Sequence, residues 1–135
     1  MNIGEAAQVS GISAKMIRYY ESVGLAPRPA RTNGNYRRYG ADDLQRLAFI
    51  RRARDLGFPL DRVRDLLTLW SDQDRHNADV RALALAHILE LEARAGELKA
   101  MIKTLRKLVR ECDGNARSRC PIMDKLGGQD RRALR

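Results

Sequence analysis

Residues 2–24, NIGEAAQVSGISAKMIRYYESVG, decide the fold, because they hold two helix starts and two helix stops in a short span. Asn2 and Ser13 are good N-caps. Gly11 and Gly24 follow the two apolar stretches and end them. Two short helices joined by a glycine-containing turn are typical of a helix-turn-helix, although the spacing alone fits an ordinary helical hairpin equally well.

Each of these two helices is expected to bury one apolar face. The predicted faces are Ala6, Ala7 and Val9 in the first helix, and Met16, Ile17 and Tyr20 in the second.

A hairpin is predicted directly after the helices. Pro27 and Pro29 exclude a helix there, and Asn33-Gly34 is a strong hairpin turn. Residues 36–39, YRRY, have the composition of a short strand. The segment therefore predicts a two-stranded wing.

The wing would bring cations onto the surface of the second helix. It would place Arg31, Arg37 and Arg38 beside Lys15 and Arg18. Cations and tyrosines gathered on one surface suit contact with phosphates and a DNA groove.

The charge of the chain points the same way. Lys and Arg number 26 against 17 Asp and Glu, giving a net charge of +9. This excess favours a polyanionic partner, although charge alone also fits a basic, soluble surface. The sequence has no secretory signal and no apolar stretch of membrane-spanning length, so we expect a cytoplasmic protein with reduced thiols.

Helices are predicted over most of the remaining chain. Two of them cover about 42–56 and 59–70, a polar linker follows at 71–77, and a long helix covers 78–111. The apolar positions of the long helix alternate steps of four and three, which is the heptad seam of a coiled coil. At about 1.5 Å per residue the helix spans about 50 Å, too long for a small domain to cover, so we expect the seam to meet another chain. The seam consists of Ala84, Ile88, Leu91, Ala95, Leu98, Ile102, Leu105 and Val109.

Two cysteines flank a short loop after this helix. Cys112 ends the long helix, and Cys120 precedes Pro121, which suits the first position of a short helix at 121–126. A helix N-terminus favours the thiolate of Cys120. Two thiolates without a third Cys or a nearby His suit a monovalent soft ion such as Cu(I) better than tetrahedral zinc. The spacing also fits a thiol switch or a chance pair.

Several motifs resemble the MerR family of transcription regulators. The resemblance covers essentially the whole chain, and its cysteine loop followed by Pro121-Ile122 resembles the copper-efflux branch. The matching stretches are IGEAA at 3–7, IRYYE at 17–21, GL at 24–25, NYRRY at 35–39 and RHNADV at 75–80.

The resemblance implies a mainly α fold in four parts. These are a winged helix-turn-helix DNA-binding domain at 1–70, a linker and antiparallel coiled-coil dimerisation helix at 71–111, a metal-binding loop and short helix at 112–128, and a disordered tail at 129–135. It implies a homodimer on double-stranded promoter DNA with an overlong spacer. Metal binding would then favour a conformer that kinks and untwists the DNA and aligns both promoter elements for RNA polymerase.

The resemblance also assigns site residues. Cys112 and Cys120 would bind Cu(I), with Ag(I) or Au(I) as alternative ions. Asn77 stands where copper sensors of this branch carry Ser and divalent-ion relatives carry Cys, and Arg81 could offset the remaining negative charge of the site. The implied DNA contacts are Lys15, Arg18, Tyr19 or Tyr20, Tyr36 and Arg37, with Arg54 as a phosphate contact.

Three alternatives remain beside the copper hypothesis. One is a sensor of divalent zinc, cadmium or lead, against which the Asn at position 77 counts. Another is a redox sensor in which Cys112 and Cys120 form a disulfide, and a third is a DNA-binding module without a ligand. An enzyme is not predicted, because the chain has no paired carboxylates on one face, no nucleotide-binding glycine loop and no Ser-His-Asp set.

Overall fold

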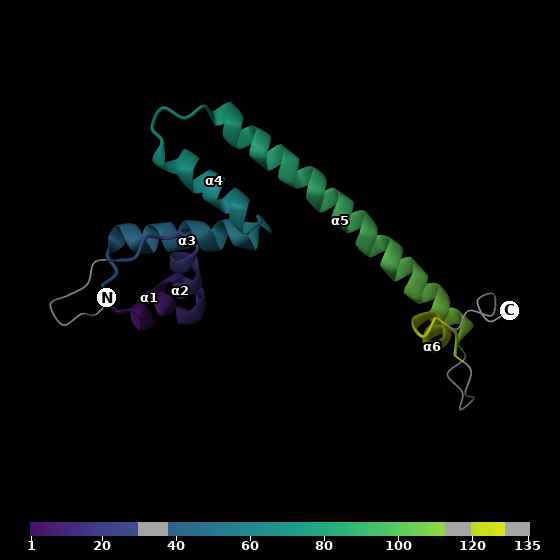
Figure 1. The fold of residues 1–135 in the computed structure, drawn as a ribbon. Coiled ribbons are helices and arrows are strands. Elements are labelled where there is room, and N and C mark those ends of the chain that lie inside the picture. Colours follow the sequence, from purple (N-terminus) through teal and green to yellow (C-terminus); the bar gives the residue numbers. More distant parts are fainter. Residues whose placement is uncertain (30–37, 113–119, 129–135) are drawn as a thin grey trace. The chain divides into compact units, whose positions relative to one another are not determined.

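The computed structural model describes residues 1–29, 38–112 and 120–128. These residues form helices and contain no strand, which confirms the mainly α fold. The helices are α1 (Ile3–Ser10), α2 (Ala14–Ser22), α3 (Ala41–Asp55), α4 (Leu60–Ser71), α5 (Asn77–Glu111) and α6 (Pro121–Leu126) (Figure 1).

The predicted caps fix the first two helices. The side chain of Asn2 accepts a hydrogen bond from the backbone N–H of Glu5 at 2.9 Å. Ser13 accepts one from the N–H of Met16 at 3.1 Å. Gly11 ends α1 in the left-handed conformation with φ 72°, which glycine adopts without the steric cost of a Cβ.

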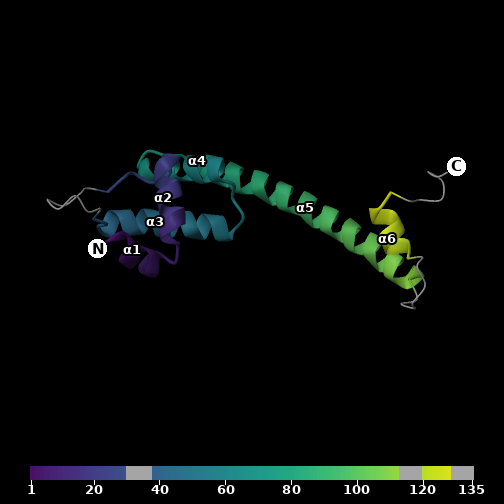
Figure 2. The same ribbon diagram turned by 60° about the horizontal axis from the view of Figure 1, so that its bottom comes forward.

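The chain forms two compact units, an N-terminal unit (Met1–Leu85) and a C-terminal unit (Ala86–Arg135). The limit between the two units falls within α5 and not at residue 70 or 111. The predicted domain limits at these two positions therefore stay predictions. In the N-terminal unit α1 packs against α2 and α3, and α3 packs against α4. Both ribbon views place α1 and α4 on opposite sides of α3 (Figures 1 and 2).

One core holds the N-terminal unit together. Its largest fully buried side chains are Ile17, Leu25, Leu47, Ile50, Val63 and Leu67. The predicted faces of the first two helices were partly wrong, because Val9 is 62% exposed and Met16 is 38% exposed. The short α1 buries Ala6 and Ser10, and α2 turns Ile17 and Tyr20 inward, so Met16, about 100° around the helix from Ile17, points outward.

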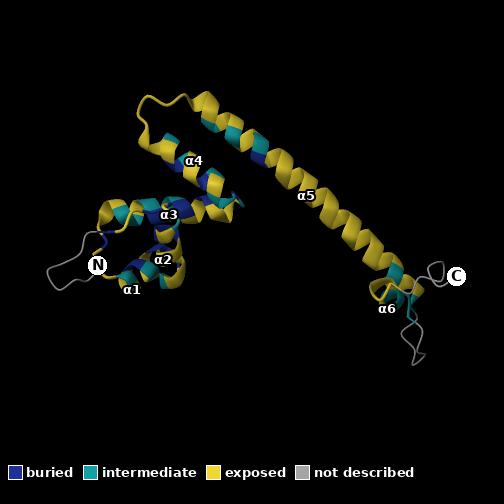
Figure 3. Ribbon diagram, in the orientation of Figure 1, coloured by how far each residue is buried: buried dark blue, intermediate teal, exposed yellow. Residues whose placement is uncertain are grey.

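Helix α5 is the longest element, with 35 residues. It begins one residue before the predicted start and ends at the predicted residue. In the single chain its surface is exposed along most of its length (Figure 3). The large members of the predicted seam are exposed between 39% at Leu91 and 59% at Val109, so this apolar stripe has no cover within the described part of the chain.

The predicted wing turn at Asn33-Gly34 and the tail at 129–135 lie outside the described residues. At the end of the wing segment, Tyr39 and Met1 exchange two hydrogen bonds. The N–H of Tyr39 donates to the carbonyl of Met1 at 2.7 Å, and the amino terminus donates to the carbonyl of Tyr39 at 3.1 Å. Among the described helices, none is long and apolar enough to cross a membrane.

Candidate DNA interface and metal site

Helix α2 presents a polar and aromatic outer face. Lys15, Arg18 and Tyr19 are all exposed, and their spacing of three and four residues puts them on one side of the helix. Ser13 caps the start of this helix and the core side chain Ile17 fixes its rotation. The outer face is therefore held rigidly by the opposite, buried face.

Tyr20 does not belong to this outer face, which corrects its place among the DNA-contact candidates. It is 5% exposed and lies in the hydrophobic core, whereas Tyr19 is 46% exposed. Adjacent residues on a helix point about 100° apart, and here that step carries Tyr20 into the core while Tyr19 stays at the surface. Of the pair, Tyr19 is the one that can touch a ligand outside the helix.

A buried hydrogen bond ties the end of the wing segment to α2. The hydroxyl of Tyr39 donates to Oε1 of Glu21 at 2.6 Å, and both side chains are buried. A carboxylate accepting a short O–H bond is a strong, charge-assisted contact. This bond fixes one end of the segment that the sequence predicts to be the wing.

Two of the remaining candidate DNA contacts lie among the described residues, and three do not. Arg38 is exposed. Arg54 is exposed too, and its Nη1 donates to the carbonyl of Phe58 at 2.7 Å, in the turn between α3 and α4. Arg31, Tyr36 and Arg37 lie outside the described residues.

Three further arginines, which no motif in the sequence marks, bind backbone carbonyls in the N-terminal unit. Arg46 donates to the carbonyl of Leu25 at 2.9 Å, and Arg64 donates to the carbonyl of Val23 at 2.6 Å. Both carbonyls lie just after α2. Arg51 donates to the carbonyl of Ser10 at 3.1 Å, at the turn between α1 and α2.

These bonds tie the last residue of α1 and the segment after α2 to α3 and α4. These hydrogen bonds could not be predicted from local sequence patterns, because each bond joins residues that are 21 or 41 positions apart.

The two cysteines lie together in the C-terminal unit. Cys112 directly follows α5, with its N–H bonded to the carbonyl of Leu108 at 3.0 Å. Cys120 is the N-cap residue of α6. Their Sγ atoms are 3.4 Å apart in hydrogen-bond contact, and both cysteines are free thiols and half-buried.

The environment of Cys120 favours its thiolate. The backbone N–H of Met123 lowers the pKa of the Cys120 thiol, and the Cys112 side chain and the N–H of Ile122 lower it further. These N–H groups belong to the first turn of α6, where a helix has unsatisfied donors. The sequence predicts that the helix start favours the thiolate of Cys120, and these N–H groups agree with that prediction.

The donor set fits a soft ion. Metal–sulfur bonds are about 2.3 Å long, so two sulfurs 3.4 Å apart are within reach of one shared ion after a small rearrangement. Within the described residues, no group of three or more His, Cys, Asp or Glu could hold a metal. In the part of the chain that the structure describes, the metal ligands offered at this site are therefore the two thiols.

Comparisons with known proteins identify the family. The model of the MerR HTH family regulatory proteins matches residues 1–69, and the model described as MerR, DNA binding matches residues 44–108. The chain belongs to the MerR family. The family prediction is therefore confirmed. Membership of a family of transcription regulators also agrees with the prediction that the chain is a regulator and not an enzyme.

Relatives cover nearly the whole chain. The HTH-type transcriptional regulator HmrR of Sinorhizobium medicae is 50% identical over 93% of this chain and 86% of its own length. The HTH-type transcriptional regulator CueR of Yersinia pestis is 40% identical over 95% of this chain and 92% of its own.

A solved structure shows the same MerR fold. The transcription regulator PbrR691 of Ralstonia metallidurans, in complex with lead(II), is 40% identical, with a TM-score of 0.78 over 93% of this chain and 98% of its own.

Two residues of the MerR-like pattern lie away from the cysteines in the sequence. Asn77 begins α5 and Arg81 follows about one turn later, and both are exposed. They belong to the N-terminal unit, whereas the cysteines belong to the C-terminal unit. Their predicted action on the metal site of a partner chain stays a prediction.

Proposed function

We propose that this MerR-family chain is a metal-responsive transcriptional activator that senses Cu(I) through Cys112 and Cys120. The observation that carries the proposal is the pair of free thiols at 3.4 Å, joining the end of α5 to the start of α6. Relatives named HmrR and CueR, and relatives named heavy metal-dependent transcription regulators, support it. Ag(I) and Au(I) have the same soft, monovalent chemistry and would fit the same pair.

The charge of the site favours a monovalent ion. Two thiolates and one monovalent ion leave a single negative charge, which a nearby cation such as Arg81 of a partner chain could offset. Zn(II) in structural sites is almost always bound by four ligands. The described residues offer two thiols and no larger ligand group.

A divalent ion is the second candidate, because the lead(II)-bound PbrR691 is 40% identical to this chain. The residue that weighs against a divalent ion is Asn77, which offers no thiolate as a third ligand. A redox switch is the third candidate, since two thiols in contact need little movement to form a disulfide.

The proposed response uses the whole chain. A homodimer joined through the exposed seam of α5 would place two copies of α2 on promoter DNA in the cytoplasm, with Lys15, Arg18 and Tyr19 facing the DNA. Because Cys112 directly follows α5, binding at the thiol pair acts on the end of the dimerisation helix. Metal binding can shift transcription only if it favours the conformer that deforms the DNA for RNA polymerase.

In vitro transcription tests this proposal. Wild type, Cys112→Ser and Cys120→Ser are compared at buffered Cu(I), Zn(II) and Pb(II), with operator binding measured in parallel. We expect Cu(I) alone to activate the wild type, and each Ser variant to bind operator DNA but not to respond. Activation by Zn(II) or Pb(II) without Cu(I) would overturn the metal assignment, and full Cu(I) activation of both variants would overturn the site.

A disulfide mechanism predicts a different result. Oxidant would then activate the wild type in the absence of metal, and a mass loss of two hydrogens would accompany the activation. Metal activation under full reduction would contradict it.

A further inference from the structure

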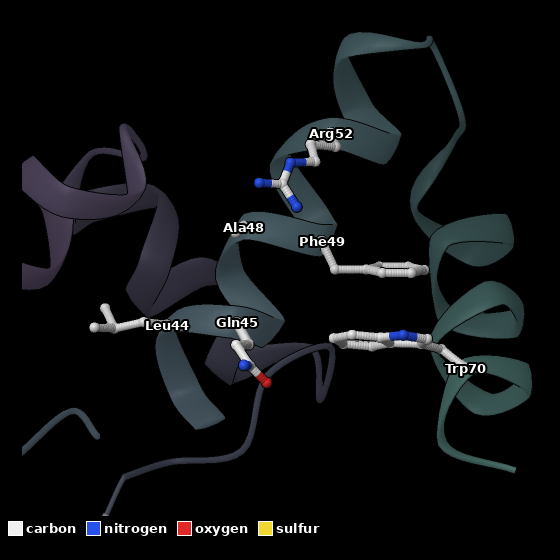
Figure 4. Close-up of a pocket in the computed structure, with 6 residues that line it drawn as sticks. All are labelled: Leu44, Gln45, Ala48, Phe49, Arg52 and Trp70. Atoms are coloured by element: carbon white, nitrogen blue, oxygen red, sulfur yellow. The ribbon is translucent and has the colours of Figure 1, made fainter. Parts of the chain in front are cut away.

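A groove on the N-terminal unit contains none of the residues proposed for DNA binding or metal sensing. Its volume is about 410 Å³, and it lies along α3 beside the end of α4 (Figure 4). Small-molecule sites begin at about 300 Å³, so the groove is large enough for a compact organic ligand. It is lined by Leu44, Gln45, Ala48, Phe49, Arg52 and Trp70.

Two stacked rings form one wall of this groove. Phe49 of α3 and Trp70 of α4 have ring centroids 4.5 Å apart and planes inclined by 19°, and Figure 4 shows the rings lying one above the other. Trp70 is nevertheless 44% exposed. Stacking holds the rings in place, so they form a preformed apolar wall of the groove rather than a mobile side chain.

Arg52 adds a cation at the same groove. The other three arginines of α3 are engaged, since Arg46, Arg51 and Arg54 each donate to a backbone carbonyl. Arg52 makes no side-chain hydrogen bond or ion pair within the described residues, and it is one of the residues that line the groove. A guanidinium stays charged at any physiological pH and binds carboxylates through two parallel hydrogen bonds.

We propose that this groove binds a small planar aromatic carboxylate. The flat body of the ligand would contact Leu44, Ala48 and the rings of Phe49 and Trp70, and its carboxylate would pair with Arg52. The Gln45 amide, which also lines the groove, can donate or accept a further bond. Such a site is independent of Cys112 and Cys120 and would give the DNA-binding unit a second ligand.

The chain carries its own probe of this groove, because Trp70 is its single tryptophan. One indole N–H signal is therefore expected in the two-dimensional ¹H–¹⁵N NMR spectrum of the full-length protein. Titration with 2-naphthoate should shift this signal saturably. The neutral isostere 2-naphthamide should bind about tenfold more weakly, since a hydrogen bond to a charged group contributes roughly that factor.

Variants separate the charge from the apolar surface. Arg52→Gln should weaken naphthoate binding about tenfold and remove its advantage over naphthamide. Lys107→Gln, which removes the same charge from an exposed position on α5, should leave both affinities unchanged. No shift of the indole signal at millimolar naphthoate, or equal affinities in wild type and Arg52→Gln, would overturn the proposal whatever the outcome of the metal experiments.

Discussion

At the scale of single residues, buried polar contacts stabilise the N-terminal unit. The hydrogen bond from the Tyr39 hydroxyl to Glu21 measures 2.6 Å, and both side chains are buried. A buried carboxylate that loses a donor keeps its desolvation cost. Tyr39 therefore contributes more through its hydroxyl than an exposed tyrosine does.

Tyr39→Phe should lower the free energy of unfolding by about 1–3 kcal/mol, the usual cost of removing a donor from a buried polar group. Tyr19→Phe is the matched control, because Tyr19 is exposed and its change should stay within about 0.5 kcal/mol. Urea denaturation at one protein concentration measures both, since the stability of a dimer depends on concentration. Equal stabilities of the two variants would mean that the Tyr39 hydroxyl contributes nothing.

At the scale of elements, α5 carries its charges asymmetrically. Glu90, Glu92 and Glu97 lie in its middle part, and the following stretch to Arg110 contains cations and no acid. In the antiparallel pair of α5 helices that the sequence predicts, the acidic part of one chain would lie opposite the basic part of the other. If the seam pairs symmetrically about its middle, Ala95 of one chain would lie opposite Leu98 of its partner, and Lys99 would lie beside the partner's Glu92.

A charge exchange tests this arrangement. Lys99→Glu and Glu92→Lys should each weaken the dimer about fivefold, because twofold symmetry repeats the pair and an exposed pair contributes about 0.5 kcal/mol. The double variant should recover the wild-type dissociation constant, measured by sedimentation equilibrium at low salt. Additive weakening in the double variant would show that the two residues do not meet.

Helix limits could be predicted from the sequence because their signals are local. The caps at Asn2 and Ser13, and Pro121 at the start of α6, act within one turn, and the structure has helix starts at these places. The same local signals predicted that Cys112 lies at the end of the long helix and Cys120 at the start of the short one.

Contacts between distant segments could not be predicted in this way. The stacking of Phe49 on Trp70 and the bond from Arg51 to Ser10 depend on how α1, α3 and α4 pack. The outward orientation of Met16 has the same origin, because apolar spacing on a short helix allows more than one buried face and packing selects between them.

At the scale of the whole molecule, net charge says less about DNA binding than the placement of charge does. The excess of cations is shared between both units, and several arginines of α3 and α4 are used to hold backbone carbonyls. The exposed face of α2 differs, because Lys15 and Arg18 lie on a helix that is fixed by its caps and core. Cations on such a fixed helix can contact phosphates without the entropy cost of ordering a loop.

Arg18→Ala should therefore weaken operator binding and reduce its salt dependence. Removing one phosphate interaction lowers the slope of log K against log salt by about 0.9, so a homodimer without the Arg18 interaction in either chain should have a slope smaller by about two units.

Lys107→Ala removes the same charge from an exposed position on α5 and should leave the slope unchanged, which separates a specific interaction from the general effect of net charge. Fluorescence anisotropy on operator DNA between about 50 and 200 mM salt covers the range in which phosphate neutralisation affects affinity. An unchanged slope for Arg18→Ala would mean that α2 does not bind the DNA through this residue, whereas equal slopes in the two variants, both below wild type, would assign the effect to net charge alone.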